Sequence, residues 1–459
     1  MPPTRLKRAI RRLDAVALVV GSMIGSGIFI VSAESARRVG SGAGLLGVWI
    51  AAGALTLVAS LYCAELAAML PRAGGQYVFF REAYGPLAGF LFGWAMLTVI
   101  QTGTIAAVAV AFARFTGVLL PAVSSEPLVA AGGVAVSRVQ LLAMGVVVLL
   151  TATNATGLAA GTRTQNALTA VKVASLAGLA AAMLAFGRAA APAASAQPPS
   201  PAGWAFVPAF ALAMVGPLFS QSAWNNVTFA GEEVEDPGRA LPFALLAGCV
   251  LVTALYVATN AGYLRTLTLG EIQHAAEDRV GTAAASRLFG AAGASAMAAA
   301  IMVSTFGCVN GLVLSGGRVG YAMARDGLLF RGFARLNAAA VPARALWLQA
   351  AWSCVLVLSG TYSQLLRYVI SADVLLYVLL VAAVIVLRRR HPEWPRPFRA
   401  PLYPWIQVLY AIAATALSAL LLAGDPKTTA PGYGVLLLGV PVYLLWRRGR
   451  AAPEGPSKP

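Results

Sequence analysis

The sequence predicts an all-α integral membrane protein with twelve transmembrane helices, and three observations support this prediction. The chain of 459 residues is 59% hydrophobic and only 11% charged, whereas roughly 25% of the residues in a soluble domain are charged. Many apolar runs reach the length of about 20 residues that a helix needs to cross the hydrocarbon core. Lys and Arg are concentrated in both tails and in alternate loops, as expected of a multi-pass protein.

Twelve apolar segments define the predicted helices. Their even number places both tails on one side, and the excess of Lys and Arg makes that side the cytoplasm, with the helices in the plasma membrane (the bacterial inner membrane). The net charge of +17 therefore orients the chain and does not indicate a nucleic-acid partner. The predicted spans are 13–36, 43–70, 86–120, 137–158, 165–187, 204–230, 241–263, 288–324, 344–361, 363–388, 402–423 and 431–447.

The first span is interrupted by the stretch Gly21-Ser22-Met23-Ile24-Gly25-Ser26-Gly27-Ile28-Phe29. Glycine costs about 1 kcal/mol relative to alanine inside a helix, so these glycines indicate either close helix packing or a break with open backbone amides. Open backbone at membrane depth is tolerated only where it is buried in protein or lines a water-filled cavity. The stretch predicts a ligand site between two half-helices. The alternative is a packing face of small residues.

A second interruption lies in the sixth span. Between Gly216 and Asn226 the sequence GPLFSQSAWNN places a proline and five polar side chains at mid-depth, where a continuous lipid-facing helix would be costly. Interruptions at corresponding positions of two halves are a strong sequence pointer to the substrate site of a transporter. The alternative is a proline kink whose polar side chains bind neighbouring helices.

The proline-rich, uncharged stretch at 189–203 cannot hold a packed helix and is predicted to be an external linker. It separates five helices from the next five, which suggests two inverted repeats followed by two further helices. The predicted parts are a cytoplasmic N-terminal tail (1–12), the first five-helix repeat (13–188), the linker (189–203), the second five-helix repeat (204–390), a cytoplasmic loop with helices 11 and 12 (391–447) and a cytoplasmic C-terminal tail (448–459).

Four motifs, in this order and spacing, resemble the L-type amino acid transporter branch of the amino acid, polyamine and organocation superfamily. They are GSMIGSGIF (21–29), FSQSAWNNVTFAGEEVEDPGRALP (219–242), STFGCVNGLVLSGGRVGYAMARDGLL (304–329) and RRRHPEWPRPFRAPLYP (388–404). The resemblance runs from about residue 13 to residue 447. It implies the leucine-transporter-like fold of inverted five-helix repeats and the transport of amino acids by alternating access.

The resemblance also implies where a substrate would bind. Its carboxylate would lie on the backbone amides of Gly25, Ser26 and Gly27, because the N-terminus of a half-helix presents free N–H groups and partial positive charge. Its ammonium would lie on backbone carbonyls at the ends of half-helices, which carry partial negative charge. These carbonyls belong to Met23, Ile24, Phe219 and Ser222. Phe219 would also be the gate over the substrate, unless it only fills space in the core.

Two ionisable residues lie within predicted spans, where such residues are functional candidates. Asp373 is expected to line the side-chain pocket with Asn225 and to favour small polar or cationic substrates; the alternative is an acid that is neutral or paired with Arg367. Lys172 is expected to couple transport, with carbonyls of the first break and the Thr305 hydroxyl as acceptors. In relatives a lysine here replaces the cation of sodium-coupled members. The alternative is that Lys172 reaches water.

The leading function is therefore sodium-independent secondary transport of amino acids, as an exchanger. A proton-coupled permease for amino acids, amines or polyamines is the alternative. Neither catalytic residues nor a metal site or cofactor is predicted, since both histidines lie in loops and an enzyme would need a nucleophile with its base or a metal cluster at depth. Animal members bind a heavy chain through an external cysteine. The loop at 121–136 has no cysteine, so no disulfide-linked heavy chain is expected.

Overall fold

The computed structural model describes residues 6–131, 134–189, 201, 203–359 and 362–448. Within these residues, eleven helical segments are long and apolar enough to cross a membrane. A twelfth apolar helix, α16 (Ala343–Ser359), is 17 residues long. The predicted all-α fold with twelve spanning segments is confirmed. Most of the predicted linker at 189–203 and of the predicted C-terminal tail lies outside the described residues, as do residues 1–5 of the N-terminal tail. The domain boundaries therefore stay predictions.

The first five spanning segments contain one broken helix and one with a π-helical turn. They are α1 (Arg12–Met23) with α2 (Gly27–Ile30) and α3 (Ser32–Val39); α4 (Gly42–Met69); α6 (Pro86–Ala95) with a π-helical turn (Met96–Ile100) and α7 (Gln101–Leu119); α8 (Arg138–Thr156); and α9 (Leu158–Phe186). A short helix, α5 (Gln76–Tyr84), joins the second and third segments.

The remaining segments begin with the second broken helix. They are α10 (Phe206–Ala213) with α11 (Val215–Ser220) and α12 (Asn226–Phe229); α13 (Pro237–Thr266); α15 (Val280–Arg325); α16; α17 (Tyr362–Arg390); α18 (Trp405–Gly424); and α19 (Pro426–Arg448). Short connections contain α14 (Leu269–Gln273) and four 3-10 turns, at Gly203–Ala205, Gly231–Glu233, Ala276–Asp278 and Arg331–Ala334.

One small sheet was not predicted from the hydropathy pattern. Strands β1 (Pro127–Ala131) and β2 (Val134–Ser137) pair antiparallel between α7 and α8, with Pro127 opposite Ser137 and Ala131 opposite Val134. Two adjacent glycines between short valine-containing runs are a hairpin signal. The strands are too short to stand out in a hydropathy pattern that identifies spans of about 20 residues. Ser137 then begins α8 through a capping box with Gln140.

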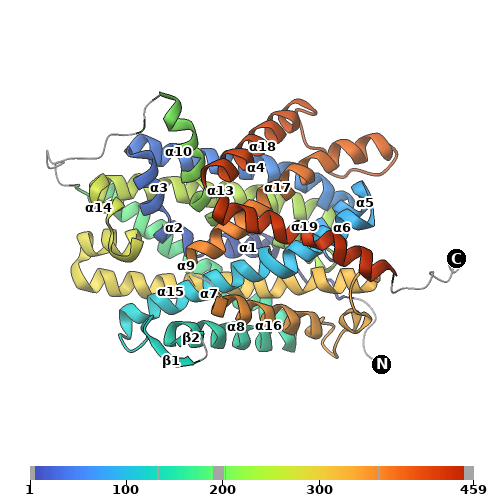
Figure 1. The fold of residues 1–459 in the computed structure, drawn as a ribbon, viewed down its shortest axis with the longest axis horizontal. Helices are drawn as coiled ribbons and strands as arrows, with labels where there is room; N and C mark the ends of the chain where they lie inside the picture. The colour runs from blue at the N-terminus through green and yellow to red at the C-terminus, as the bar shows by residue number, and fades with distance from the viewer. Residues whose placement is uncertain (1–5, 132–133, 190–200, 202, 360–361, 449–459) are drawn as a thin grey trace, which may run out of the picture.

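The helices run between two faces of the molecule. Figure 1 shows α3, α10 and α14 at one end and α5 with the end of α19 at the other. We call this second end the N-terminal face. It carries Ile10, which forms a parallel bridge with Val234, and the C-terminal end of α15, where Arg325 lies 3.2 Å from Glu232.

The core of the protein lies around α1, α7 and α15, whose residues are mostly buried. α13 packs against α1 and α4, and α15 packs against α7 and α9. By contrast, α18 and α19 expose most of their apolar side chains at the periphery, as expected of helices that face lipid. The residues at both breaks are buried among the other helices, which is where open backbone is tolerated in a membrane.

Candidate substrate site

The first broken helix opens at the glycine-rich stretch. α1 ends at Met23, Ile24 is extended (φ −76°, ψ 93°), and α2 begins at Gly27. Within the described residues, the backbone N–H groups of Gly25 and Gly27 have no hydrogen-bond partner. Two open amides at the start of a half-helix form an environment suited to a carboxylate. The amide of Ser26 lies between these two in the chain.

The carbonyl end of the first break is already engaged by the protein. The Met23 carbonyl accepts a hydrogen bond from the Tyr256 hydroxyl at 3.0 Å. The Ile24 carbonyl accepts one from Lys172 Nζ at 2.8 Å and one from Ser304 Oγ at 3.1 Å. A substrate ammonium would therefore have to share these two carbonyls with the protein donors or displace those donors.

The second broken helix opens between Ser220 and Asn226, and Ala223 has a left-handed backbone (φ 65°) there. The Phe219 carbonyl accepts hydrogen bonds from both the backbone N–H and the hydroxyl of Ser222, at 3.0 and 2.7 Å. The Ser222 carbonyl has no partner among the described residues. Of the four carbonyls predicted to hold an ammonium, this one is thus open.

The two breaks lie directly against each other. A Cβ added at Gly27 would come within 2.0 Å of Ser220 Oγ and 3.1 Å of Ser220 Cα. The Tyr256 hydroxyl of α13 reaches the Met23 carbonyl and, at 3.2 Å, the Ser220 carbonyl. Gly27 is therefore required for helix packing whether or not a carboxylate approaches it. Sequence reasoning missed Tyr256, although a tyrosine in the middle of an apolar span is a signal that could have identified it.

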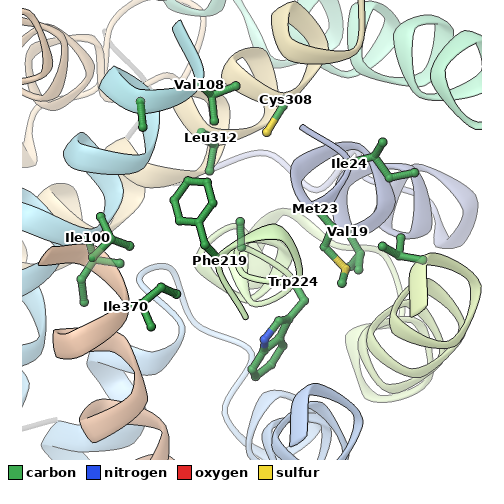
Figure 2. Close-up of a cluster of buried hydrophobic side chains, with 14 of the residues drawn as sticks. Val19, Met23, Ile24, Ile100, Val108, Phe219, Trp224, Cys308, Leu312 and Ile370 are labelled. Carbon is green, nitrogen blue, oxygen red and sulfur yellow. The ribbon is translucent and has the colours of Figure 1, made fainter. Parts of the chain in front are cut away.

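Phe219 projects into the space between the broken helices and their neighbours. Its side chain is buried, and Figure 2 shows its ring pointing from α11 toward Leu312 of α15, with Ile100 and Ile370 on one side and Met23 on the other. These neighbours are apolar. The arrangement is compatible with a gate over a substrate side chain and equally with a core-packing role.

Lys172 lies deep in the protein with only 1% of its surface exposed, so the alternative that it reaches water is not supported. Its Nζ donates to the carbonyls of Gly21 and Ile24, at 2.7 and 2.8 Å. Thr305, the predicted hydroxyl partner, instead donates to the carbonyls of Ile301 and Met302 in its own helix. Its neighbour Ser304 shares the Ile24 carbonyl with Lys172.

Asn225 and Asp373 face different neighbours. The Asn225 amide donates to Gln76 Oε1 of α5 at 2.8 Å. Asp373 lines a small cavity of about 20 Å³, and Asn225 is not among the residues that line it. Other lining residues are Ser222, Trp224, Tyr377 and Tyr410. Asp373 thus lies beside the second break, next to Ser222 and Trp224, while the Asn225 amide is held by α5. That Asn225 and Asp373 line one side-chain pocket stays a prediction, and the side chain of Arg367 lies outside the described residues.

Comparison with known proteins agrees with this architecture. The profile of a family described as "Amino acid permease" matches residues 10–440. The chain is 30% identical over 457 residues to the large neutral amino acids transporter small subunit 2 of Homo sapiens, covering 96% of this chain and 80% of that protein. It is 29% identical over 452 residues to the serine/threonine exchanger SteT of Bacillus subtilis (strain 168), covering 97% and 98%.

A third relative, the Asc-type amino acid transporter 1 of Mus musculus, is 28% identical over 460 residues, covering 98% of this chain and 83% of that protein. Each match spans both broken helices and Lys172. Three observations lead to one assignment: the two open amides, the half-helix ends that face each other, and the family match over residues 10–440. The chain is an amino acid transporter that belongs to the amino acid permease family, in the L-type branch of the amino acid, polyamine and organocation superfamily.

Proposed function

We propose that the protein exchanges neutral amino acids independently of sodium across a bacterial inner membrane, with both termini in the cytoplasm. One observation carries the proposal. The Lys172 ammonium donates to the Gly21 and Ile24 carbonyls at the end of α1, at 2.7 and 2.8 Å. By the family resemblance, this is where sodium-coupled members of the fold bind their cation. A fixed charge there takes over the role of the ion.

Electrostatics explains why Lys172 would exclude sodium. Two positive charges 4 Å apart repel each other by about 4 kcal/mol at an effective dielectric constant of 20. The two carbonyls that Lys172 uses are also the acceptors that a bound ion would need. Because the Lys172 ammonium is part of the protein and cannot dissociate, transport cannot be driven by an ion gradient at this position. Exchange of one substrate for another is therefore the expected mode.

The surroundings of the breaks favour neutral substrates. The Gly25 and Gly27 amides suit a carboxylate, and the open Ser222 carbonyl suits an ammonium. The space beside them is bordered by Phe219, Leu312 and other apolar side chains. The names of the relatives point the same way, toward large neutral amino acids and toward serine and threonine. Asp373 shares a small cavity with Ser222 of the second break, so its predicted effect, a preference for small polar or cationic substrates, is tested by the same panel of substrates.

Ionic contacts close the N-terminal face beneath the breaks. Glu233 and Arg318 form a fully buried ion pair at 2.8 Å, and Glu232 pairs with Arg325 at 3.2 Å. Asp326 pairs with Arg81 and accepts a hydrogen bond from Tyr77 at 2.7 Å. In a cycle of alternating access, this face has to open before substrate can leave through it.

Orientation and partners follow from charge and cysteine content. The Lys and Arg excess on the N-terminal face favours a cytoplasmic location for it. The described part of the loop at 121–136 contains the β1–β2 hairpin, and the loop contains no cysteine. We therefore expect no disulfide-linked heavy chain.

Counterflow into proteoliposomes tests the proposal. Purified protein is reconstituted into vesicles loaded with one amino acid, and uptake of a labelled one is followed across a panel of neutral, cationic and acidic amino acids and amines. Replacing sodium with choline should leave uptake unchanged, and uptake should require a neutral amino acid inside. Sodium dependence would contradict the role of Lys172. Uptake into empty vesicles driven by a pH gradient would favour the proton-coupled alternative.

A further inference from the structure

We propose that a pocket on the N-terminal face, between the end of α17 and the segment at 391–404, binds the phosphate group of an anionic phospholipid. Four residues line it: Arg388, Pro392, Arg396 and Arg399. Its volume is about 190 Å³, and three of its four lining residues are arginines. Guanidinium presents a planar set of N–H donors that matches phosphate oxygens. The pocket is more than 300 residues along the chain from the first break and shares none of its lining residues with the substrate site.

The pocket has more positive charge than its carboxylate can neutralise. Glu65, which is buried, faces both Arg388, with Nε 2.8 Å from Oε1, and Arg396, with Nε 3.6 Å from Oε1. Two cations thus share one anion. Arg399 is exposed and has no hydrogen bond or ion pair among the described residues. An anion entering the pocket would meet a net charge of two positive units from these four side chains.

Two of the three arginines, Arg388 and Arg396, are held in place, unlike isolated surface arginines. Arg396 donates to four carbonyls, those of Leu387, His391, Pro392 and Trp394, at 3.0, 2.8, 3.2 and 2.9 Å. It therefore contributes positive charge, and the N–H donors for a phosphate come from Arg399 and from Nη1 of Arg388. Arg388 donates to the Ala400 carbonyl at 3.0 Å and lies over the Tyr403 ring at 4.4 Å. These bonds organise the pocket before any ligand arrives, so little side-chain entropy is lost on binding.

Flanking side chains place the pocket at the depth of lipid headgroups. Trp405, at the start of α18, is 79% exposed, and Leu402 is 66% exposed; tryptophan is enriched at the membrane–water interface. The exposed apolar stripe continues along α18 through Leu409 and Ile412, and α18 packs beside α17. A phospholipid whose phosphate occupies the pocket could therefore lay its acyl chains along α18. Basic pockets between helices at the cytoplasmic side are known to bind anionic headgroups.

Native mass spectrometry of the purified full-length chain tests the inference. The protein is titrated with phosphatidylglycerol or phosphatidylcholine, and bound lipid is counted for wild type, Arg399→Ala, Arg399→Lys and a control, Arg335→Ala. Arg335 is also exposed, lies in another loop of the same face and does not line the pocket. Arg399→Ala should weaken phosphatidylglycerol binding about fivefold to tenfold, Arg399→Lys less, and Arg335→Ala not at all.

A second arm identifies the source of the phosphate. Glycerol 3-phosphate and inorganic phosphate are added at millimolar concentration as competitors. Retention of phosphatidylglycerol supports a lipid site, whereas displacement that depends on Arg399 supports a site for soluble phosphates. Equal phosphatidylglycerol binding by wild type and Arg399→Ala would overturn the proposal, and so would equal binding of phosphatidylcholine. Size-exclusion profiles and counterflow of the Arg399 variants verify that they are folded.

Discussion

The Lys172 ammonium makes its hydrogen bonds to backbone carbonyls and, within the described residues, forms no ion pair with a carboxylate. A charge buried in protein is tolerated only when it is well satisfied. The end of α1 provides this, since its last carbonyls are unpaired within the helix and lie at its negative end. Lys172 thus stabilises the break in α1, and the break stabilises the charge on Lys172.

Replacing Lys172 should impair transport and also lower stability. Lys172→Ala removes donors from the Gly21 and Ile24 carbonyls, and hydrogen bonds to charged groups are each worth about 1.5–3 kcal/mol. We expect counterflow to fall at least tenfold while folded protein is still recovered. Lys427→Ala is the matched control, because Lys427 is exposed at the start of α19. Unaltered transport by Lys172→Ala would refute the coupling role.

The space around the ammonium can be tested without removing its charge. A Cβ at Gly307 of α15 would lie 3.3 Å from Lys172 Nζ and 2.9 Å from Leu168 Cβ. Gly307→Ala should displace Lys172 and reduce exchange, with an overpacking cost of about 1–3 kcal/mol. Gly178→Ala in α9 has nothing within 4 Å of the new Cβ and should be neutral or slightly stabilising. The two variants are compared by counterflow and by thermal unfolding, and equal exchange rates would contradict the expectation.

At the scale of elements, the two broken helices are joined through a continuous one. The Tyr256 hydroxyl of α13 reaches a carbonyl on each side, 3.0 Å from Met23 and 3.2 Å from Ser220. The Tyr256 ring packs edge-on against Trp49 of α4, which limits its motion. A rearrangement of either half-helix during transport therefore has to break or share this contact.

Tyr256→Phe tests the connection by removing a single oxygen atom. The ring still fills its space, but the Met23 and Ser220 carbonyls lose their donor, at a cost of about 1–3 kcal/mol for unsatisfied buried groups. We expect a changed apparent KM for substrate in counterflow assays. Tyr84→Phe is the control, since its hydroxyl also donates to a backbone carbonyl, that of Leu379 at 2.6 Å, away from the breaks. Parallel changes in KM for both variants would show that the effect is not specific to the site.

At the scale of the whole molecule, two adjacent carboxylates, Glu232 and Glu233, form ion pairs that close the N-terminal face. The two pairs differ in their exposure to solvent. Glu233 and Arg318 are each 1% exposed, whereas Glu232 and Arg325 are 26% and 50% exposed. The backbone of the same segment pairs with the N-terminal chain, because Ala9 N donates to the Glu233 carbonyl at 2.9 Å and Glu235 N donates to the Ile10 carbonyl at 2.9 Å. The buried pair supports the fold, and the exposed pair is the one that can break at low cost.

Substituting the two carboxylates one at a time should separate these roles. Glu232→Gln loses an exposed pair worth at most about 1 kcal/mol, so thermal unfolding should change little while the exchange rate changes. Glu233→Gln leaves the Arg318 charge buried and unpaired, which costs about 3–5 kcal/mol and should lower the unfolding temperature or the yield. The double variant Glu233→Met with Arg318→Met should recover stability. An equal loss of stability in both single variants would refute the distinction.

Much of the architecture could be predicted from the sequence alone because its causes are local. Hydrophobic run length identified the spans, and glycine, proline and clustered polar residues located both breaks. Lys172 was recognised because an ionisable residue inside a span needs partners wherever it lies. The β1–β2 hairpin was missed, since hydropathy averaged over a span-length window does not respond to strands of four or five residues.

The partners of the site residues were decided by tertiary structure. Ser304 and Thr305 have similar hydroxyls, but neighbouring positions on a helix point about 100° apart, so only Ser304 faces the first break. That the Asn225 amide binds Gln76 depended on how α5 packs against the second break. Local patterns in the sequence determined where this chain spans the membrane and where its helices break. The relative rotation and position of packed helices, set by contacts between residues far apart in the chain, decided which side chains meet at those breaks.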